Sequence, residues 1–124
     1  MSPRAAGATQ HELSRIGLLA TLSGETLARF AQQMTREDVP AGAQVVAEGE
    51  QGDRFYVVLR GMFSVSQEDR GAQSVLRPGD YFGEVALAMH MPRTASVRAL
   101  TPATVASCDL ATFDEFVRPL FADD

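Results

Sequence analysis

The sequence has one cysteine, no excess of positive charge and no long hydrophobic run, and each lack excludes a class of protein. Cys108 cannot form an internal disulfide, which is typical of a reducing cytoplasm. A formal charge of −5 over 124 residues leaves no basic surface for DNA, RNA or anionic lipid. No apolar run approaches the length of a membrane span, and the N-terminus lacks the apolar core of a signal peptide. We therefore expect a cytoplasmic domain, although a longer membrane or regulatory protein that contains it stays open.

The residues of common catalytic and metal centres are also scarce. The two histidines, His11 and His90, do not stand within a cluster of metal ligands. Ser14, Ser23 and Ser96 lack the G-x-S-x-G context of a hydrolase nucleophile. No helix-turn-helix module is recognisable. The sequence therefore predicts neither an enzyme nor a metal site, and no binding of nucleic acid by this chain alone.

Helical patterns occur only near the two ends of the chain. Residues 1–9 are predicted to be a disordered leader, and an apolar helical segment follows. Ser23 is a predicted N-cap for a helix over residues 24–35, and the apolar residues of 110–120 predict a final helix. The predicted strands between these helices cover residues 44–47, 55–59, 62–67, 73–76, 94–100 and 104–107. Many short strands with helices only at the ends predict a mainly β domain, a β-roll or jelly-roll barrel.

Two short runs combine features that suit an anion. FGEVAL covers residues 82–87, and PRTASV covers residues 92–97. Gly83 lets the backbone approach a ligand, and the first amides of a helix that follows it are unpaired donors. The guanidinium of Arg93 adds a planar fork of donors that matches a phosphate. Glu84 cannot face that phosphate favourably, so we expect it to accept from a hydroxyl. One anion, one hydroxyl and a base to bury describe a nucleotide with a compact phosphate.

These runs resemble the phosphate-binding cassette of cyclic nucleotide-binding domains. Supporting marks stand in the order typical of that family, at Gly52-Asp53, Gly61, Gly79-Asp80 and Tyr81-Phe82. The resemblance implies an eight-stranded roll over residues 10–124, with an N-terminal helical segment, a short cassette helix and a C-terminal helix. It also implies a non-enzymatic regulatory domain without a cofactor, whose ligand is cAMP or cGMP.

The resemblance assigns roles to individual residues. Arg93 would bind the exocyclic oxygens of the cyclic phosphate, and Glu84 would accept from the ribose 2′-hydroxyl. Gly83, Val85 and Ala86 would offer backbone contacts. Thr94 would offer its hydroxyl to the phosphate or to a guanine amino group. The full predicted set is Val65, Leu76, Phe82, Gly83, Glu84, Val85, Ala86, Arg93, Thr94 and Ala95, in which Val65 and Leu76 form an apolar wall beneath the purine.

Four questions stay open at this point. The base is not fixed, with cAMP favoured slightly over cGMP. The helix that covers the base in many members of the family is expected to be missing or truncated after Pro119. The terminal apolar residues would either dock on their own domain or support a homodimer. The alternative function is a degenerate roll that serves as a structural or interaction module without binding nucleotide.

Overall fold

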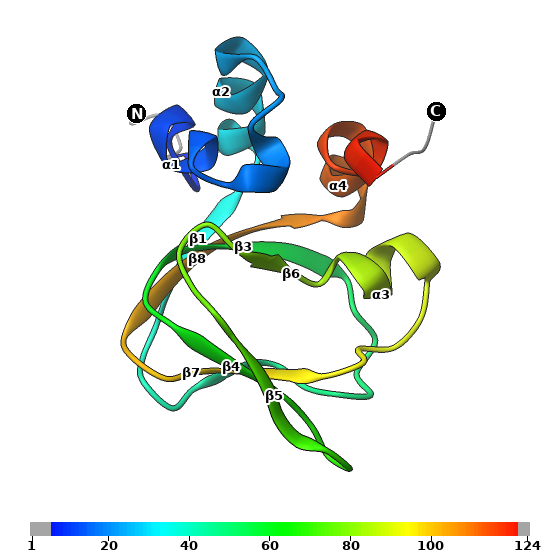
Figure 1. Cartoon of the computed structure of the whole chain (residues 1–124). Helices are drawn as coiled ribbons and strands as arrows, with labels where there is room; N and C mark the ends of the chain where they lie inside the picture. The colour runs from blue at the N-terminus through cyan, green and yellow to red at the C-terminus, as the bar shows by residue number, and fades with distance from the viewer. Residues whose placement is uncertain (1–5, 122–124) are drawn as a thin grey trace, which may run out of the picture.

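The structure, a computed structural model, describes residues 6–121 as two four-stranded antiparallel sheets, with the helices near the two ends of the chain together on one side (Figure 1). The strand orders are β1-β8-β3-β6 and β2-β7-β4-β5. The strands are β1 (Thr35–Val39), β2 (Gln44–Val46), β3 (Arg54–Arg60), β4 (Phe63–Gln67), β5 (Gly71–Leu76), β6 (Tyr81–Phe82), β7 (Ser96–Ala99) and β8 (Ala103–Asp109). The helices are α1 (Gln10–Ser14), α2 (Gly24–Gln32), α3 (Glu84–Met89) and α4 (Leu110–Phe116), with the 3-10 turns η1 (Gly17–Leu19) and η2 (Arg118–Phe121). The predicted mainly β fold with flanking helices is confirmed.

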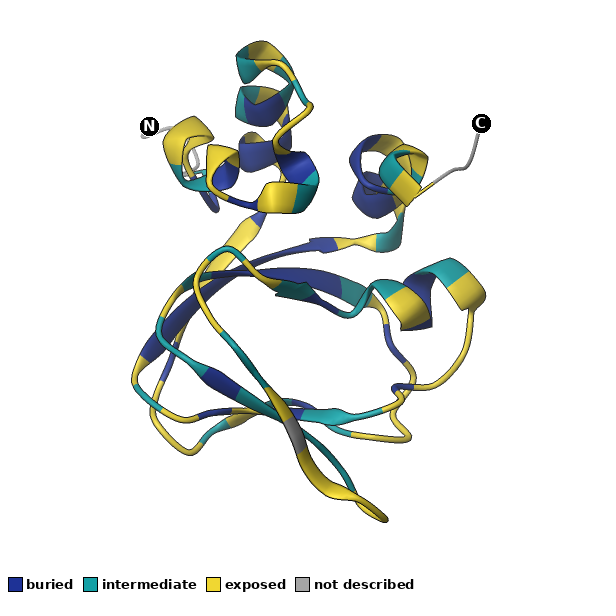
Figure 2. Ribbon diagram, viewed as in Figure 1, coloured by how far each residue is buried: buried dark blue, intermediate teal, exposed yellow. Residues whose placement is uncertain are grey.

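The central strands of the first sheet, β3 and β8, are buried on both faces because helices cover one face and the second sheet covers the other (Figures 1 and 2). Successive side chains of a strand point to opposite faces. In β3, Phe55 and Val57 therefore pack against the helices, whereas Tyr56 and Val58 pack into the core between the sheets. This double burial explains why the central strand is a continuous apolar run rather than an alternating one.

Helix α2 begins where the sequence predicts and ends earlier. The Ser23 side chain accepts a hydrogen bond from the Thr26 amide over 3.1 Å, which confirms the predicted N-cap. Helix α2 ends at Gln32, and the predicted helix is therefore too long. The next element, β1, pairs along its whole length with β8. Four of its five residues are exposed, so it has no alternating apolar pattern by which the sequence could reveal it.

Residues 6–9 differ from the predicted disordered leader. The Gly7 amide donates to the Ala31 carbonyl over 3.1 Å, and a β-carbon at Gly7 would lie 2.1 Å from the Met34 oxygen. Ala8 is only 2% exposed and belongs to the core under the helices. The leader was predicted because small residues give no periodic pattern, yet small size is what allows this close packing. Residues 1–5 lie outside the described residues.

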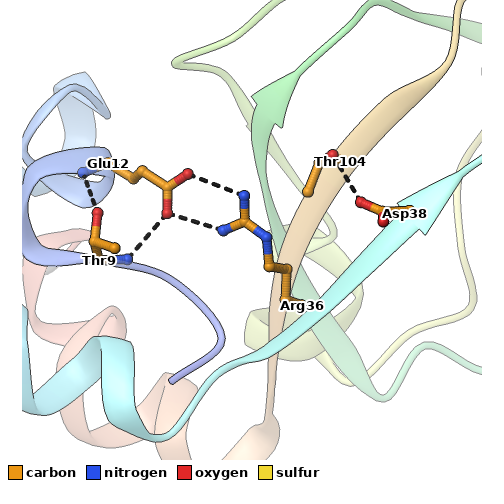
Figure 3. A network of polar contacts seen from close by, with 5 residues as sticks. All are labelled: Thr9, Glu12, Arg36, Asp38 and Thr104. Atoms are coloured by element: carbon orange, nitrogen blue, oxygen red, sulfur yellow. Dashed lines mark hydrogen bonds and ion pairs between the residues drawn. The ribbon is translucent and has the colours of Figure 1, made fainter. Parts of the chain in front are cut away.

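Thr9 and Glu12 form the N-terminal cap of α1, and Glu12 also links this helix to the first sheet (Figure 3). The Thr9 hydroxyl accepts from the Glu12 amide and the Glu12 carboxylate accepts from the Thr9 amide, each over 3.0 Å. The same carboxylate accepts from both terminal nitrogens of Arg36 on β1, over 2.9 and 3.2 Å. The hydrogen bond from Arg36 is the main reason that the pKa of Glu12 is lowered. Beside it, Thr104 donates to Asp38 over 3.0 Å, which links β8 to β1.

Helix α4 docks on its own domain. Asp109 caps its N-terminus by accepting from the Thr112 amide over 2.9 Å. Phe113 and Phe116 are buried, and the Phe116 ring stacks on Phe30 at 5.0 Å. The terminal apolar residues therefore dock on their own domain, which is one of the two arrangements that the sequence left open. Among residues 6–121, the structure contains no helix with the length and apolar character needed to cross a membrane.

Candidate functional site

A cavity of about 250 Å³ lies between the second sheet and the short helix α3, which Figure 1 shows beside the end of β6. Its lining comes from β2, β4, β5, β6 and β7, from the start of α3 and from the residues just before β7. The structure brings all ten predicted site residues to this one cavity: Val65, Leu76, Phe82, Gly83, Glu84, Val85, Ala86, Arg93, Thr94 and Ala95. Predicted residues up to thirty positions apart in the sequence, from Val65 to Ala95, therefore line the same cavity.

Arg93 is the only charged residue classed as buried among residues 6–121, with 7% of its surface exposed. Its Nη1 donates to the Gly83 carbonyl over 3.2 Å, and its Nη2 donates to the Arg54 carbonyl over 2.8 Å. Its guanidinium carbon lies 5.9 Å from the centre of the Tyr56 ring. No carboxylate of the described residues forms an ion pair with it. A buried cation that has two carbonyls and an aromatic ring beside it, but no anionic partner within the described residues, is well suited to an incoming anion, because a guanidinium carries further N–H donors.

The loop of residues 49–52 fixes Arg93 from one side. The Arg93 amide donates to the Glu50 carbonyl over 2.8 Å, and the Gly49 amide donates to the Arg93 carbonyl over 2.9 Å. A β-carbon at Gly52 would lie 2.5 Å from the β-carbon of Ala86 and 2.8 Å from both Cζ and Nε of Arg93. Such distances are well inside van der Waals contact. Glycine at this position is therefore what lets the loop, α3 and the guanidinium approach one another.

Gly83 makes the turn from β6 into α3. Its φ of 96° is in the left-handed region that disfavours residues with a side chain. A β-carbon there would also lie 2.8 Å from the Arg54 carbonyl oxygen and from Nη1 of Arg93. The helix begins at the next residue, and the amides of a first turn have no partner within their helix. Gly83 thus places these amides and the guanidinium at the same cavity.

Glu84 is half-buried, and one of its carboxylate oxygens has no hydrogen-bond donor among the described residues. Its Oε2 is buried and receives no hydrogen bond from the described residues. Burial raises the pKa of the Glu84 carboxyl, and a hydrogen bond from its own backbone and the charge of Arg93 oppose that rise. Among residues 6–121, Glu84 and Arg93 do not form an ion pair with each other. A desolvated acceptor of this kind is suited to a hydroxyl donor.

The opposite wall is largely apolar and larger than predicted. Four lining residues were missed by the sequence reasoning: Val46, Ser74, Tyr81 and Val97. Two of them could have been found from alternation along a strand, because Ser74 is two residues from Leu76 and Val97 is two residues from Ala95. Val46 faces Val97 across the β2–β7 ladder, a pairing that no local pattern reveals. Ser74, opposite Val65, adds one polar group to the wall.

Tyr81 connects the cavity to the C-terminal elements. Its ring lies 5.8 Å from that of Phe55 and 6.1 Å from that of Phe121 in η2, and Phe55 lies 5.4 Å from Phe113 in α4. Tyr81 stands beside Phe82 in the sequence, but only Phe82 was predicted to be in the site. Alternation within a strand gives no reason to place both neighbours on one cavity.

Thr94 and Ser96 have different surroundings. Thr94 is exposed and lines the cavity, so its hydroxyl is accessible from it. Ser96 does not line the cavity, and its hydroxyl accepts from the Glu48 amide over 2.9 Å. Ser96 is therefore not part of the candidate site.

Comparison with known proteins agrees with this arrangement. The family model described as "Cyclic nucleotide-binding domain" matches residues 36–119. The chain is 36% identical over 107 residues to a cAMP-dependent protein kinase regulatory subunit from Debaryomyces hansenii, and 38% identical over 108 residues to one from Eremothecium gossypii. These alignments cover 86% and 87% of the chain and 24% of each relative, so the chain spans about a quarter of their length.

Solved structures share the fold. The cAMP-bound structure of PfPKA-R superposes with a TM-score of 0.86 at 26% identity, covering 90% of this chain and 39% of that one. The regulatory domain of Toxoplasma gondii PKA with cAMP gives a TM-score of 0.85 at 27% identity, covering 90% of this chain and 44% of that one. Because the family model matches more than half of the chain and the fold is shared with these structures, the chain belongs to the cyclic nucleotide-binding domain family.

Proposed function

We propose that this chain is a non-enzymatic cytoplasmic receptor domain for a cyclic purine mononucleotide, with cAMP favoured slightly over cGMP. One observation carries the proposal: the same cavity is lined by a buried guanidinium that has no counter-ion, and a buried carboxylate oxygen that has no donor, within residues 6–121. Arg93 is suited to bind an anion, and Glu84 is suited to accept from a hydroxyl. Without such a partner, each buried group lowers the stability of the fold. A cyclic nucleotide offers both groups on one rigid ring system.

The proposed roles follow from the geometry. The exocyclic phosphate oxygens accept from Arg93 and from amides in the first turn of α3, where the backbone is also positively polarised. The ribose 2′-hydroxyl donates to Oε2 of Glu84, which discriminates against nucleotides that lack this hydroxyl. The purine lies against the apolar wall that includes Val65 and Leu76.

Two observations bear on the base. The curated relatives are named as cAMP-dependent, and two of the similar structures contain cAMP, which supports cAMP. The accessible hydroxyl of Thr94 is compatible with the amino group of guanine, so the preference over cGMP is proposed to be small.

Binding is proposed to act through the terminal helix. The anion draws residues 83–88 inward around Arg93, and the roll then repacks against residues 110–120. The aromatic contacts from Tyr81 through Phe55 to Phe113 offer a physical route for this change. A nucleotide shifts such an equilibrium only by its difference in affinity for the two arrangements.

Isothermal titration with cAMP, cGMP, 2′-deoxy-cAMP and 5′-AMP tests the proposal. The variants are Arg93→Ala and the control Arg98→Ala, whose exposed arginine donates to the Gly42 carbonyl and the Gln44 side chain. We expect saturable binding of cAMP that Arg98→Ala retains and Arg93→Ala loses, with weaker binding of the two analogues. Absence of saturable heat with either cyclic nucleotide would instead support the degenerate interaction module.

A further inference from the structure

Arg118 is the first residue of η2 and contacts the far end of the cassette helix. Its Nη1 donates to the Ala88 carbonyl and its Nη2 to the Leu87 carbonyl, both over 3.4 Å. Its Nε donates to the Asp114 carboxylate over 2.6 Å, one turn earlier in α4. Its guanidinium carbon lies 5.5 Å from the centre of the Phe113 ring. One side chain therefore joins the C-terminal element to α3 through direct polar contacts.

The two sets of contacts differ in strength. The 2.6 Å charge-assisted bond to Asp114 and the contact with the Phe113 ring hold the guanidinium against α4. An acid four residues before a base is also the favoured order for such a pair. The 3.4 Å contacts to α3 are at the long end of the hydrogen-bond range and are easily broken or shortened. Arg118 is thus fixed on α4 and loosely attached to α3.

The Arg118 guanidinium lies beside the C-terminal carbonyls of α3, where a positive charge is electrostatically favourable. The last carbonyls of a helix are unpaired acceptors with partial negative charge, and a cation beside them stabilises the helix. Helix α3 ends at Met89, and its C-cap His90, with a φ of 53°, is the only non-glycine residue with a positive φ among residues 6–121. A cation at this end and an anion at the opposite end both favour the same alignment of α3, so each should strengthen the binding of the other.

We propose that Arg118 is a positioning residue that couples the cassette helix to the C-terminal element α4–η2, an inference that rests on the proposed binding of a cyclic nucleotide. When the phosphate orders the start of α3, the hydrogen bonds from Arg118 to the carbonyls of Leu87 and Ala88 shorten. Because Asp114 and Phe113 hold that guanidinium, the movement reaches η2. Reciprocally, a fixed Arg118 raises the affinity for the nucleotide.

The test compares Arg118→Gln with Arg29→Gln. Arg29 of α2 is the matched control because its guanidinium lies 5.5 Å from the ring of Phe116 in α4, while it makes no hydrogen bond or ion pair with α3 within the described residues. In the nucleotide-free protein, amide hydrogen exchange in α3 should be faster in Arg118→Gln than in Arg29→Gln or the wild type. Equal exchange in all three proteins would overturn the inference without involving nucleotide.

The second part adds saturating cAMP. We expect the amide resonances of Leu120 and Phe121 to shift in the wild type and in Arg29→Gln, and the shifts to collapse in Arg118→Gln while those of α3 persist. The affinity of Arg118→Gln should fall about two- to fivefold, the size of a helix-end charge effect. Unchanged shifts and affinity in Arg118→Gln would refute the coupling. A wild type that binds no cAMP would refute the proposed function, and with it the coupling to nucleotide.

Discussion

Replacing Gly52 with alanine is the sharpest test of how the site is built. The added β-carbon would meet the β-carbon of Ala86 at 2.5 Å and two atoms of the Arg93 guanidinium at 2.8 Å. Ordinary carbon contacts are about 3.5–4.0 Å, so the overlap is roughly 1 Å. The guanidinium is the more mobile neighbour and would move, which sacrifices its alignment toward the phosphate. A charge-assisted contact contributes about 1.5–3 kcal/mol, so cAMP affinity should fall about 10- to 150-fold.

The assay is titration calorimetry of Gly52→Ala beside Gly17→Ala, with a thermal melt of each. Gly17 is a suitable control because a β-carbon there would have no neighbour within 4 Å and its φ is not in the left-handed region. Overpacking at residue 52 should cost about 1–3 kcal/mol of stability, whereas the control should be nearly neutral. If Gly52→Ala bound cAMP and melted like the control, the packing of the loop against Arg93 would be wrong.

Three further predictions concern the core and the titratable groups. Phe55→Ala should cost about 3–5 kcal/mol in chemical denaturation, because Phe55 is fully buried between Tyr81 and Phe113; a silent variant would contradict the core. Because burial raises the pKa of Glu84, the folded state holds its proton more tightly, so the contribution of Glu84 to stability falls as pH rises from the unfolded to the folded pKa. Over the same pH range cAMP affinity should rise, since the ribose hydroxyl prefers the ionised carboxylate; Glu84→Gln should remove both trends, and a flat wild-type profile would refute the role. Burial raises the pKa of the Cys108 thiol to about 12, so a disulfide reagent at pH 8 should modify it only after unfolding, and rapid labelling of the native protein would contradict the packing of β8.

The site was predictable because it is local in sequence and chemically distinctive. The runs 82–87 and 92–97 carry a glycine, an acid and an arginine whose types and spacing suit a phosphate and a hydroxyl. The wall residues Val65 and Leu76 were predicted from the resemblance to the family, because no local pattern of the sequence marks them as part of a site. Residues such as Val46 come from pairing between distant strands, and Tyr81 from the end of a two-residue strand, so neither has a local pattern.

The elements that the sequence missed lack hydrophobic periodicity. Strand β1 is mostly exposed and owes its conformation to ladder hydrogen bonds with β8. Residues 6–9 are packed through small side chains, which composition alone suggests to be a leader. The sequence reveals neither that Arg93 donates to two carbonyls nor that Oε2 of Glu84 lacks a donor among the described residues, because both depend on where three separate segments meet.

A crystal structure of the chain grown with cAMP would test the central claim most directly. The account predicts the nucleotide in the cavity beside α3, with phosphate oxygens within hydrogen-bond distance of the Arg93 guanidinium and the 2′-hydroxyl on Oε2 of Glu84. A nucleotide bound elsewhere, or an empty cavity in crystals grown at saturating cAMP, would contradict it.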